Sequence, residues 1–79
     1  MKIITWNCNG AFRDKFAYLT KLKADVYVIQ ECENPIETKH HEYQQWAKNY
    51  FWIGESKHNG LGVFASEEIR LTCLNWINN

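Results

Sequence analysis

The sequence predicts a small α/β (α+β) domain with one mixed β-sheet and two helices on one of its faces. Three observations favour this fold class. The first half of the chain has a strand–helix–strand order, the second half begins with another segment of helical periodicity, and two strand-like segments joined by a short polar loop follow it. With 79 residues, the chain has room for one domain with a modest core.

Apolar patterns indicate the first strand and the first helix. Residues 2–7 (KIITWN) are β-branched and aromatic and carry apolar side chains on both faces, which is typical of a central strand. Asn9 and Gly10 then break the chain. Residues 11–23 are expected to form one amphipathic helix. Its apolar residues recur in steps of four, three and three at Phe12, Phe16, Leu19 and Leu22.

A second buried strand is expected at residues 26–30 (VYVIQ). A strand, a helix and a strand within about thirty residues form a βαβ unit. The two strands should therefore be parallel and joined by a right-handed crossover.

The second half of the chain is expected to add a helix and an antiparallel pair of strands. A turn or helix start at Asn34 and Pro35 precedes four residues at i, i+3, i+4 and i+7, namely Tyr43, Trp46, Ala47 and Tyr50. Residues 51–54 and 60–65 are strand-like, and the short loop between them makes them antiparallel. Residues 69–74 alternate loosely and are interpreted as a last strand.

Charge and hydropathy narrow the function classes. Nine Lys plus Arg balance nine Asp plus Glu, so no global positive field points to nucleic acid. No apolar run approaches the ~20 residues of a membrane span, and the N-terminus lacks the apolar region of a signal peptide. A cytoplasmic protein without membrane association is therefore expected.

Three cysteines without a CxxC motif, Cys8, Cys32 and Cys73, favour reduced thiols over a disulfide framework. A small zinc-stabilised domain that uses them with His40 and His41 is an alternative, although these spacings match no standard zinc-ligand pattern.

Two polar residues follow the predicted parallel strands. Asn7 ends the first strand and Glu31 follows the second. Since the carboxyl ends of parallel strands meet at one edge of a sheet, where open α/β sheets bind ligands, these side chains should converge. An amide oxygen and a carboxylate are hard donors of the kind that Mg²⁺ prefers. Each residue also has a plainer interpretation: Asn7 as a turn residue, and Glu31 as a solvated or lysine-paired carboxylate.

The segments around these two residues carry a family resemblance. Residues 5–10 are TWNCNG, and residues 24–31 are ADVYVIQE. With a helix between them, they resemble the start of the endonuclease/exonuclease/phosphatase superfamily, which includes DNase-I-like nucleases and abasic-site endonucleases. Its first strand ends in W/F-N-x-N-G and its second in Q-E. Residues 52–54 and 60–65 are similar to its antiparallel strand pair, so the resemblance covers nearly all of the chain.

The resemblance implies a metal-dependent hydrolase of phosphate esters, a phosphodiesterase or nuclease, with Mg²⁺ or Mn²⁺ as cofactor and nucleic acid among its candidate substrates. Glu31 would be a direct metal ligand and Asn7 would assist it, so both are candidate catalytic residues. Asn9 would order the loop, and Gln30 would form a hydrogen bond at the floor of the site.

The resemblance also implies that residues 1–79 are the N-terminal part of one domain, a partial four-layer α/β/β/α sandwich whose C-terminal half is absent. The family's Asp-x-Asn segment and late Asp-His motif have no match, because Asp14 and Asp25 lie in the first helix and before the second strand. We therefore expect a chain that is inactive alone. The alternative is a non-catalytic interaction module.

Helices on one face leave the other face of the sheet exposed. Four or five strands present a face of about 300–400 Å², and its alternate residues are largely apolar. Covering it is worth several kcal/mol at about 25 cal/mol per Å². Self-association through this face, binding of the missing C-terminal half, or poor solubility is therefore expected.

Overall fold

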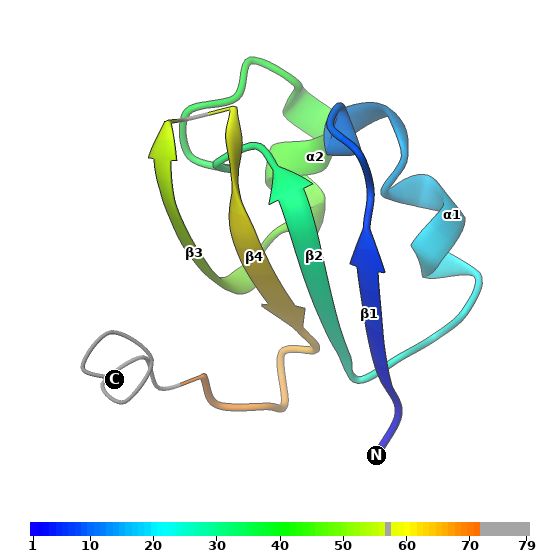
Figure 1. Cartoon of the computed structure of the whole chain (residues 1–79). Coiled ribbons are helices and arrows are strands. Elements are labelled where there is room, and N and C mark those ends of the chain that lie inside the picture. The colour runs from blue at the N-terminus through cyan, green and yellow to red at the C-terminus, as the bar shows by residue number, and fades with distance from the viewer. Residues whose placement is uncertain (57, 72–79) are drawn as a thin grey trace.

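The computed structural model describes residues 1–56 and 58–71 as one four-stranded sheet with two α-helices and a 3-10 helix. The strands are β1 (Ile3–Asn7), β2 (Val26–Cys32), β3 (Asn49–Ser56) and β4 (Asn59–Ala65), and the helical segments are η1 (Phe12–Asp14), α1 (Ala17–Thr20) and α2 (His41–Trp46). Figure 1 shows both α-helices on the same face of the sheet. The predicted α+β class, with one mixed sheet and two helices on one face, is confirmed.

The strand order is β1-β2-β4-β3, so the two parallel strands lie side by side. β1 pairs with β2 in parallel, from Ile3 opposite Val26 to Asn7 opposite Gln30. β4 pairs antiparallel with both β2 and β3. The strand–helix–strand unit and the antiparallel pair are therefore as expected, and the carboxyl ends of β1 and β2 share one edge of the sheet (Figure 1).

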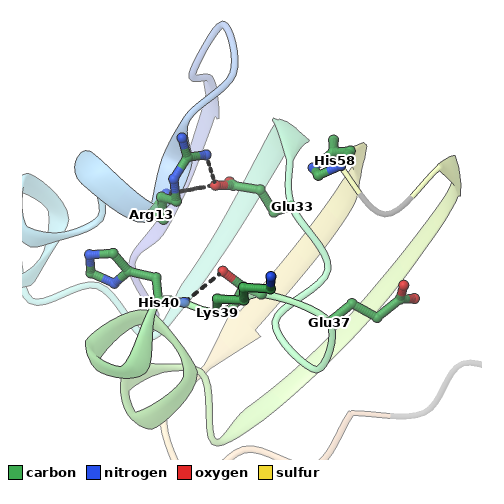
Figure 2. A pocket seen from close by; sticks show the side chains of 7 residues that line it. Arg13, Glu33, Glu37, Lys39, His40 and His58 are labelled. Atoms are coloured by element: carbon green, nitrogen blue, oxygen red, sulfur yellow. Dashed lines mark hydrogen bonds and ion pairs between the residues drawn. The ribbon is translucent and has the colours of Figure 1, made fainter.

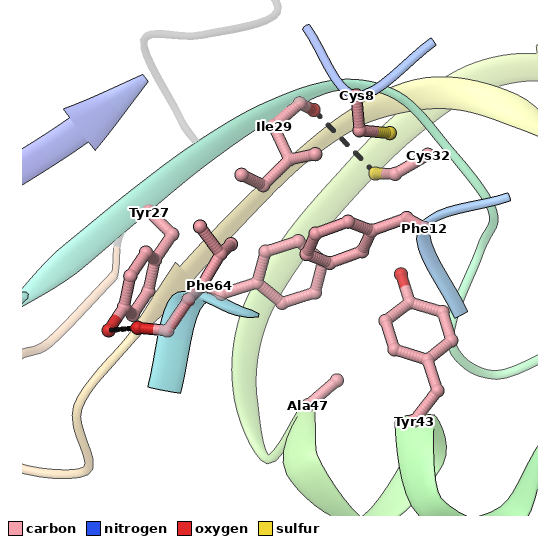
Figure 3. Close-up of a cluster of buried hydrophobic side chains, with 9 residues drawn as sticks. Cys8, Phe12, Tyr27, Ile29, Cys32, Tyr43, Ala47 and Phe64 are labelled. Carbon is pink, nitrogen blue, oxygen red and sulfur yellow. Dashed lines mark hydrogen bonds between the residues drawn. The ribbon is translucent and has the colours of Figure 1, made fainter. Parts of the chain in front are cut away.

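The core lies between the sheet and the helical segments, and aromatic rings make up most of it (Figure 3). Phe12 is fully buried at its centre, and its ring centroid lies 5.5 Å from Tyr43, 5.7 Å from Trp46 and 5.6 Å from Phe64. Aromatic pairs of this kind add about 0.5–1.5 kcal/mol beyond the burial of their area. One ring from η1, two from α2 and one from β4 therefore hold the two layers together.

The single helix expected over residues 11–23 is wrong. The chain forms η1 and α1 instead, separated near Lys15, which has a φ of −121°. Ala11, just before η1, has a left-handed φ of 54° and a side chain that cannot cap the helix. The first backbone N–H groups therefore receive no capping hydrogen bond from this residue. The following hydrogen bonds are mostly of the tighter i→i+3 type. Phe12, Phe16 and Leu19 of the predicted apolar face still pack in the core. Leu22, the fourth residue of that face, is 45% exposed.

Two predicted boundaries in the second half also differ. α2 ends at Trp46, and Tyr50 belongs to β3, where its ring stacks on Phe64 at 6.0 Å. Tyr50 contacts the same core as α2, which explains why its position matched a helical spacing. Residues 69–71 are not a strand, and the remainder of the predicted last strand lies outside the described residues. Within residues 1–56 and 58–71, no helix has the length and apolar character needed to cross a membrane.

Packing explains the glycine at position 60, the second residue of β4. A Cβ atom at Gly60 would collide with the ring of Trp52 and with the carbonyl of Ile53. The indole of Trp52 lies against β4 at this point, and its Nε1–H donates to the Cys32 carbonyl at 3.0 Å. Gly60 therefore allows an aromatic ring to close one end of the core.

Replacing the central ring should unfold much of the domain. Phe12→Ala removes a fully buried side chain, and such changes cost about 3–5 kcal/mol. For a domain of this size, we expect a fall in melting temperature of more than about 10 °C by circular dichroism. Tyr18→Ala is the matched control, because Tyr18 is 69% exposed and should change little. Equal effects of the two substitutions would contradict the described core.

Candidate functional site at the carboxyl edge

A β-bulge interrupts β2 near its carboxyl end. Two residues of β2, Gln30 and Glu31, lie opposite a single residue of β4, Leu61. Ile29 and Cys32, on either side of the bulge, are both fully buried in the core. Since side chains alternate between faces along a regular strand, the extra residue is what returns Cys32 to the helix face.

The backbone at this edge is strained. Glu31 has a φ of 58°, in the left-handed region that side chains other than glycine rarely occupy. Three consecutive residues after β1 share this conformation, with φ of 61° at Asn9, 84° at Gly10 and 54° at Ala11. Each such non-glycine residue costs on the order of 1–3 kcal/mol, and they concentrate at functional sites. The carboxyl edge of the parallel pair is therefore a functional candidate on backbone geometry alone.

The structure places Asn7 and Glu31 at the same edge and on the same side of the sheet. Asn7 lies opposite Gln30 in the parallel ladder, and neighbouring strands are about 4.8 Å apart. Trp6 packs on the core, and neighbouring residues of a strand point to opposite faces. Asn7, which is exposed, therefore lies on the open face. The bulge places Gln30 and Glu31 between two core residues, so both lie off the helix face as well. The two residues therefore lie at neighbouring strand ends, and the convergence of their side chains stays a prediction.

Asn7 also has the turn role that its sequence context suggested. Its Oδ1 accepts the backbone N–H of Asn9 at 3.1 Å, an Asx-type turn. An amide oxygen has two lone pairs, so this bond leaves one acceptor position. Asn9 contributes to the loop through its backbone N–H, and the residue is exposed. The turn holds the Asn7 oxygen in a fixed orientation at the edge.

Glu31 and Gln30 have different surroundings. Glu31 is half-buried, and its carboxylate has no hydrogen bond or ion pair within residues 1–56 and 58–71, so no lysine pairs with it there. Gln30 is exposed, and the hydrogen bond expected from its side chain is not found among those residues. Its carbonyl does take part, since it accepts the Cys8 N–H at 3.2 Å. The sequence therefore indicated the right strand end for Gln30 but the wrong group.

Two buried thiols lie beneath this edge. The Sγ of Cys8 is 3.3 Å from the carbonyl oxygens of both Gln30 and Glu31, and can donate to either. Burial raises the pKa of the Cys8 thiol, and it raises the pKa of Cys32 to about 12. Both are therefore neutral at neutral pH and act as packing groups. Thiolate chemistry, which needs a lowered pKa, is disfavoured for them.

Sequence analysis missed Glu33. Its carboxylate, only 5% exposed, accepts the Arg13 guanidinium at 2.7 Å and the Arg13 backbone N–H at 3.3 Å (Figure 2). This hydrogen bond, reinforced by the charge of Glu33, raises the pKa of Arg13. The Tyr43 hydroxyl donates to the Glu33 carbonyl at 2.7 Å. The local sequence does not distinguish Glu33 from Glu31. Their environments differ because of the bulge, and the bulge contains no glycine that would indicate its position in the sequence.

The oxygen donors at the carboxyl edge fit one kind of metal site. No group of three or more His, Cys, Asp or Glu side chains is placed to hold a metal among the described residues, and Cys73 of the zinc alternative lies outside them. Mg²⁺ differs in its requirement, because it commonly takes one or two carboxylates and completes its octahedron with waters and substrate phosphates. Glu31, at the strand end next to Asn7, is compatible with that smaller requirement.

Comparison of this chain with known protein families and with curated proteins found no match. The resemblance to the endonuclease/exonuclease/phosphatase superfamily therefore rests on the sequence motifs alone, at residues 5–10, 24–31, 52–54 and 60–65.

Alkaline pH should destabilise the fold through Cys32. The thiol of the unfolded chain ionises near its ordinary pKa of 9.0, whereas in the folded chain its pKa is about 12. Between these values the unfolded state binds fewer protons than the folded state, so the stability of the fold decreases as pH rises. The raised pKa of the buried Tyr43 hydroxyl acts in the same direction.

Urea denaturation between about pH 8 and pH 11 measures this dependence. Cys32→Ala should lower the stability at every pH and show a shallower decrease with pH than the unmodified chain. Parallel curves would mean that the Cys32 thiol is not protected in the fold.

Proposed function

We propose that the carboxyl edge of the parallel strand pair binds a divalent cation, Mg²⁺ or Mn²⁺, as part of a site for the hydrolysis of phosphate esters. The bulge in β2 carries this proposal. It lies at the strand end next to Asn7 and contains Glu31, whose half-buried carboxylate has no partner among the described residues. Bulges next to active sites commonly re-aim a side chain. The family resemblance supplies the reaction class.

Each residue has a defined task in this proposal. Glu31 binds the cation through its carboxylate, from a backbone position with a left-handed φ of 58°. Asn7, held by its bond from Asn9, offers its remaining lone pair to the cation or to one of its waters. When bound, the cation neutralises charge that builds up on the phosphoryl and leaving-group oxygens.

The general base that hydrolysis also requires is not provided by either aspartate. The carboxylate of Asp25 accepts the Lys2 backbone N–H at 2.7 Å, at the opposite edge of the sheet. Asp14 lies in η1, where its carboxylate is 4.0 Å from the Nε of Arg13. The proposed role is therefore cation and phosphate binding, with the proton-transfer group contributed from outside these 79 residues.

Cation binding can be measured directly. Paramagnetic Mn²⁺ should broaden the amide resonances around Asn7 and Glu31 before others, and excess Mg²⁺ should reverse the broadening. Glu31→Gln keeps the size of the side chain and removes its charge, so it should weaken binding by more than about tenfold. Glu55→Gln, an exposed glutamate on β3, is the matched control. Equal broadening in Glu31→Gln would contradict the assignment.

The 79-residue chain alone should show no appreciable phosphodiesterase activity. General acid and base groups each contribute about 10²–10⁴-fold to such reactions, and none is assigned at this edge. The assay is Mg²⁺-dependent cleavage of an abasic-site duplex and of a simple phosphodiester. Cleavage that Glu31→Ala abolishes would show that the chain holds a complete catalytic site.

A second candidate function, a non-catalytic interaction module, is favoured by the open face of the sheet. Ile3 on β1 is 57% exposed and Ile53 on β3 is 44% exposed, and Val28 on β2 is half-buried between them in the strand order. A sheet with an uncovered apolar face gains stability when that face is covered.

If the open face of the sheet is an interaction surface, the isolated chain should self-associate through it. Sedimentation of the chain at high micromolar concentration should show dimers or larger species, and Ile53→Lys should shift them towards the monomer. Ile36→Lys is the control, because Ile36 is 72% exposed but lies outside the sheet. A well-folded monomer that binds no dye for exposed apolar surface would exclude this function.

A further inference from the structure

A pocket of about 550 Å³ lies near the same end of the sheet, next to the end of β2. Three segments that are distant in sequence line it: η1, the connection from β2 to α2, and the turn between β3 and β4. Figure 2 shows the charged and imidazole side chains around it, which are Arg13, Glu33, Glu37, Lys39, His40 and His58.

The two acidic groups of the pocket already have partners. The Glu33 carboxylate accepts two kinds of N–H group from Arg13, the guanidinium at 2.7 Å and the backbone at 3.3 Å. The Oε1 of Glu37 accepts the side-chain amide of Asn34 at 3.1 Å. Much of their acceptor capacity is therefore used within the protein.

Most of the hydrogen-bond donors of the pocket, in contrast, are not used within the described part of the protein. Within residues 1–56 and 58–71, neither the Lys39 ammonium nor the His58 imidazole has a hydrogen-bond or ion-pair partner. The Nδ1 of His40 accepts the Tyr43 backbone N–H at 3.3 Å, so the proton of its neutral ring is on Nε2, which is a donor. Arg13 uses only part of its five-donor guanidinium on Glu33. Unused donors from three segments therefore surround one hollow.

We propose that this pocket binds a phosphate group. A ligand for it must supply several acceptor oxygens and negative charge, because the unused groups are donors and two of them belong to the basic residues Arg13 and Lys39. A phosphate group has more acceptor oxygens than a carboxylate, and Arg and Lys are common phosphate-binding residues. A metal cation fits this pocket poorly, because Arg13 and Lys39 line it and both of its carboxylates already have partners.

The site is separate from the proposed cation site but close to it. Glu33 follows Glu31 by two residues, so their Cα atoms are at most about 7.6 Å apart. The phosphate can therefore be free phosphate or a second phosphate group of a substrate whose first phosphate lies at Glu31.

The test is a titration of the chain with inorganic phosphate in the presence of EDTA, followed through the imidazole resonances in NMR spectra. The resonances of His40 and His58 should shift in a saturable manner, while His41, which is exposed and outside this pocket, should not. Sodium chloride at matched ionic strength is the salt control. No saturable shift, or an equal shift of His41, would overturn the proposal.

Variants test the donors individually. Lys39→Gln and His58→Gln should each weaken phosphate binding by roughly three- to tenfold. Lys48→Gln, an exposed lysine outside the pocket, should leave it unchanged. Unchanged binding in both pocket variants would refute the site. Glu31→Gln should keep phosphate binding in EDTA, so a failure of the proposed cation site can be distinguished from a failure of this one.

The two sources of the phosphate group can be separated. If it belongs to a substrate, a short oligonucleotide without a terminal phosphate should shift His58 at lower concentration than inorganic phosphate does. If the pocket takes free phosphate, inorganic phosphate should be the tighter ligand. Absence of binding by either ligand would overturn the proposal.

Discussion

The left-handed conformation of Glu31, in the bulge of β2, decides which residues of this strand lie on each face of the sheet. One extra residue in β2 allows Ile29 and Cys32 to be buried on the same face, although three positions separate them. The same extra residue leaves Glu31 off that face, beside Asn7. A regular strand could not satisfy both conditions, because its side chains alternate strictly. Core packing and the candidate cation site are thus two consequences of one backbone irregularity.

Glu33 extends this effect into the helical layer. Because Cys32 is back in register with the core, the next residue leaves the sheet towards η1, and its carboxylate binds both the backbone and the side chain of Arg13. This carboxylate takes the place of the missing side-chain cap of η1. It also fixes the residue after Phe12, the ring on which the aromatic core is built. The end of β2 therefore helps to position the carboxyl edge, the core and the proposed phosphate pocket.

Local patterns predicted the elements that depend on local physics. The strands β1, β2 and β4 and the parallel pairing of β1 with β2 followed from residue type and spacing. The position of Asn7 and Glu31 at neighbouring strand ends followed from the parallel pairing of β1 and β2.

The features that sequence reasoning missed arise from contacts distant in sequence. Residues 11–23 have helical periodicity, but a carboxylate twenty positions later holds the Arg13 backbone N–H, and the first turn is 3-10. Tyr50 fits a helical spacing only because β3 reaches the same core as α2. The bulge carries no glycine, and so its position could not be identified from residue types.

Glycine substitution is the most direct test of the left-handed bulge position of Glu31. Glycine adopts positive φ without strain, so Glu31→Gly should leave the free energy of unfolding unchanged or raise it by up to about 1 kcal/mol. The neighbouring substitution Gln30→Gly, at a strand residue without positive φ, should lower it by about 0.5–1 kcal/mol. Urea denaturation of the two variants gives the comparison. A loss of stability in Glu31→Gly equal to that in Gln30→Gly would show that β2 is a regular strand and would contradict the account.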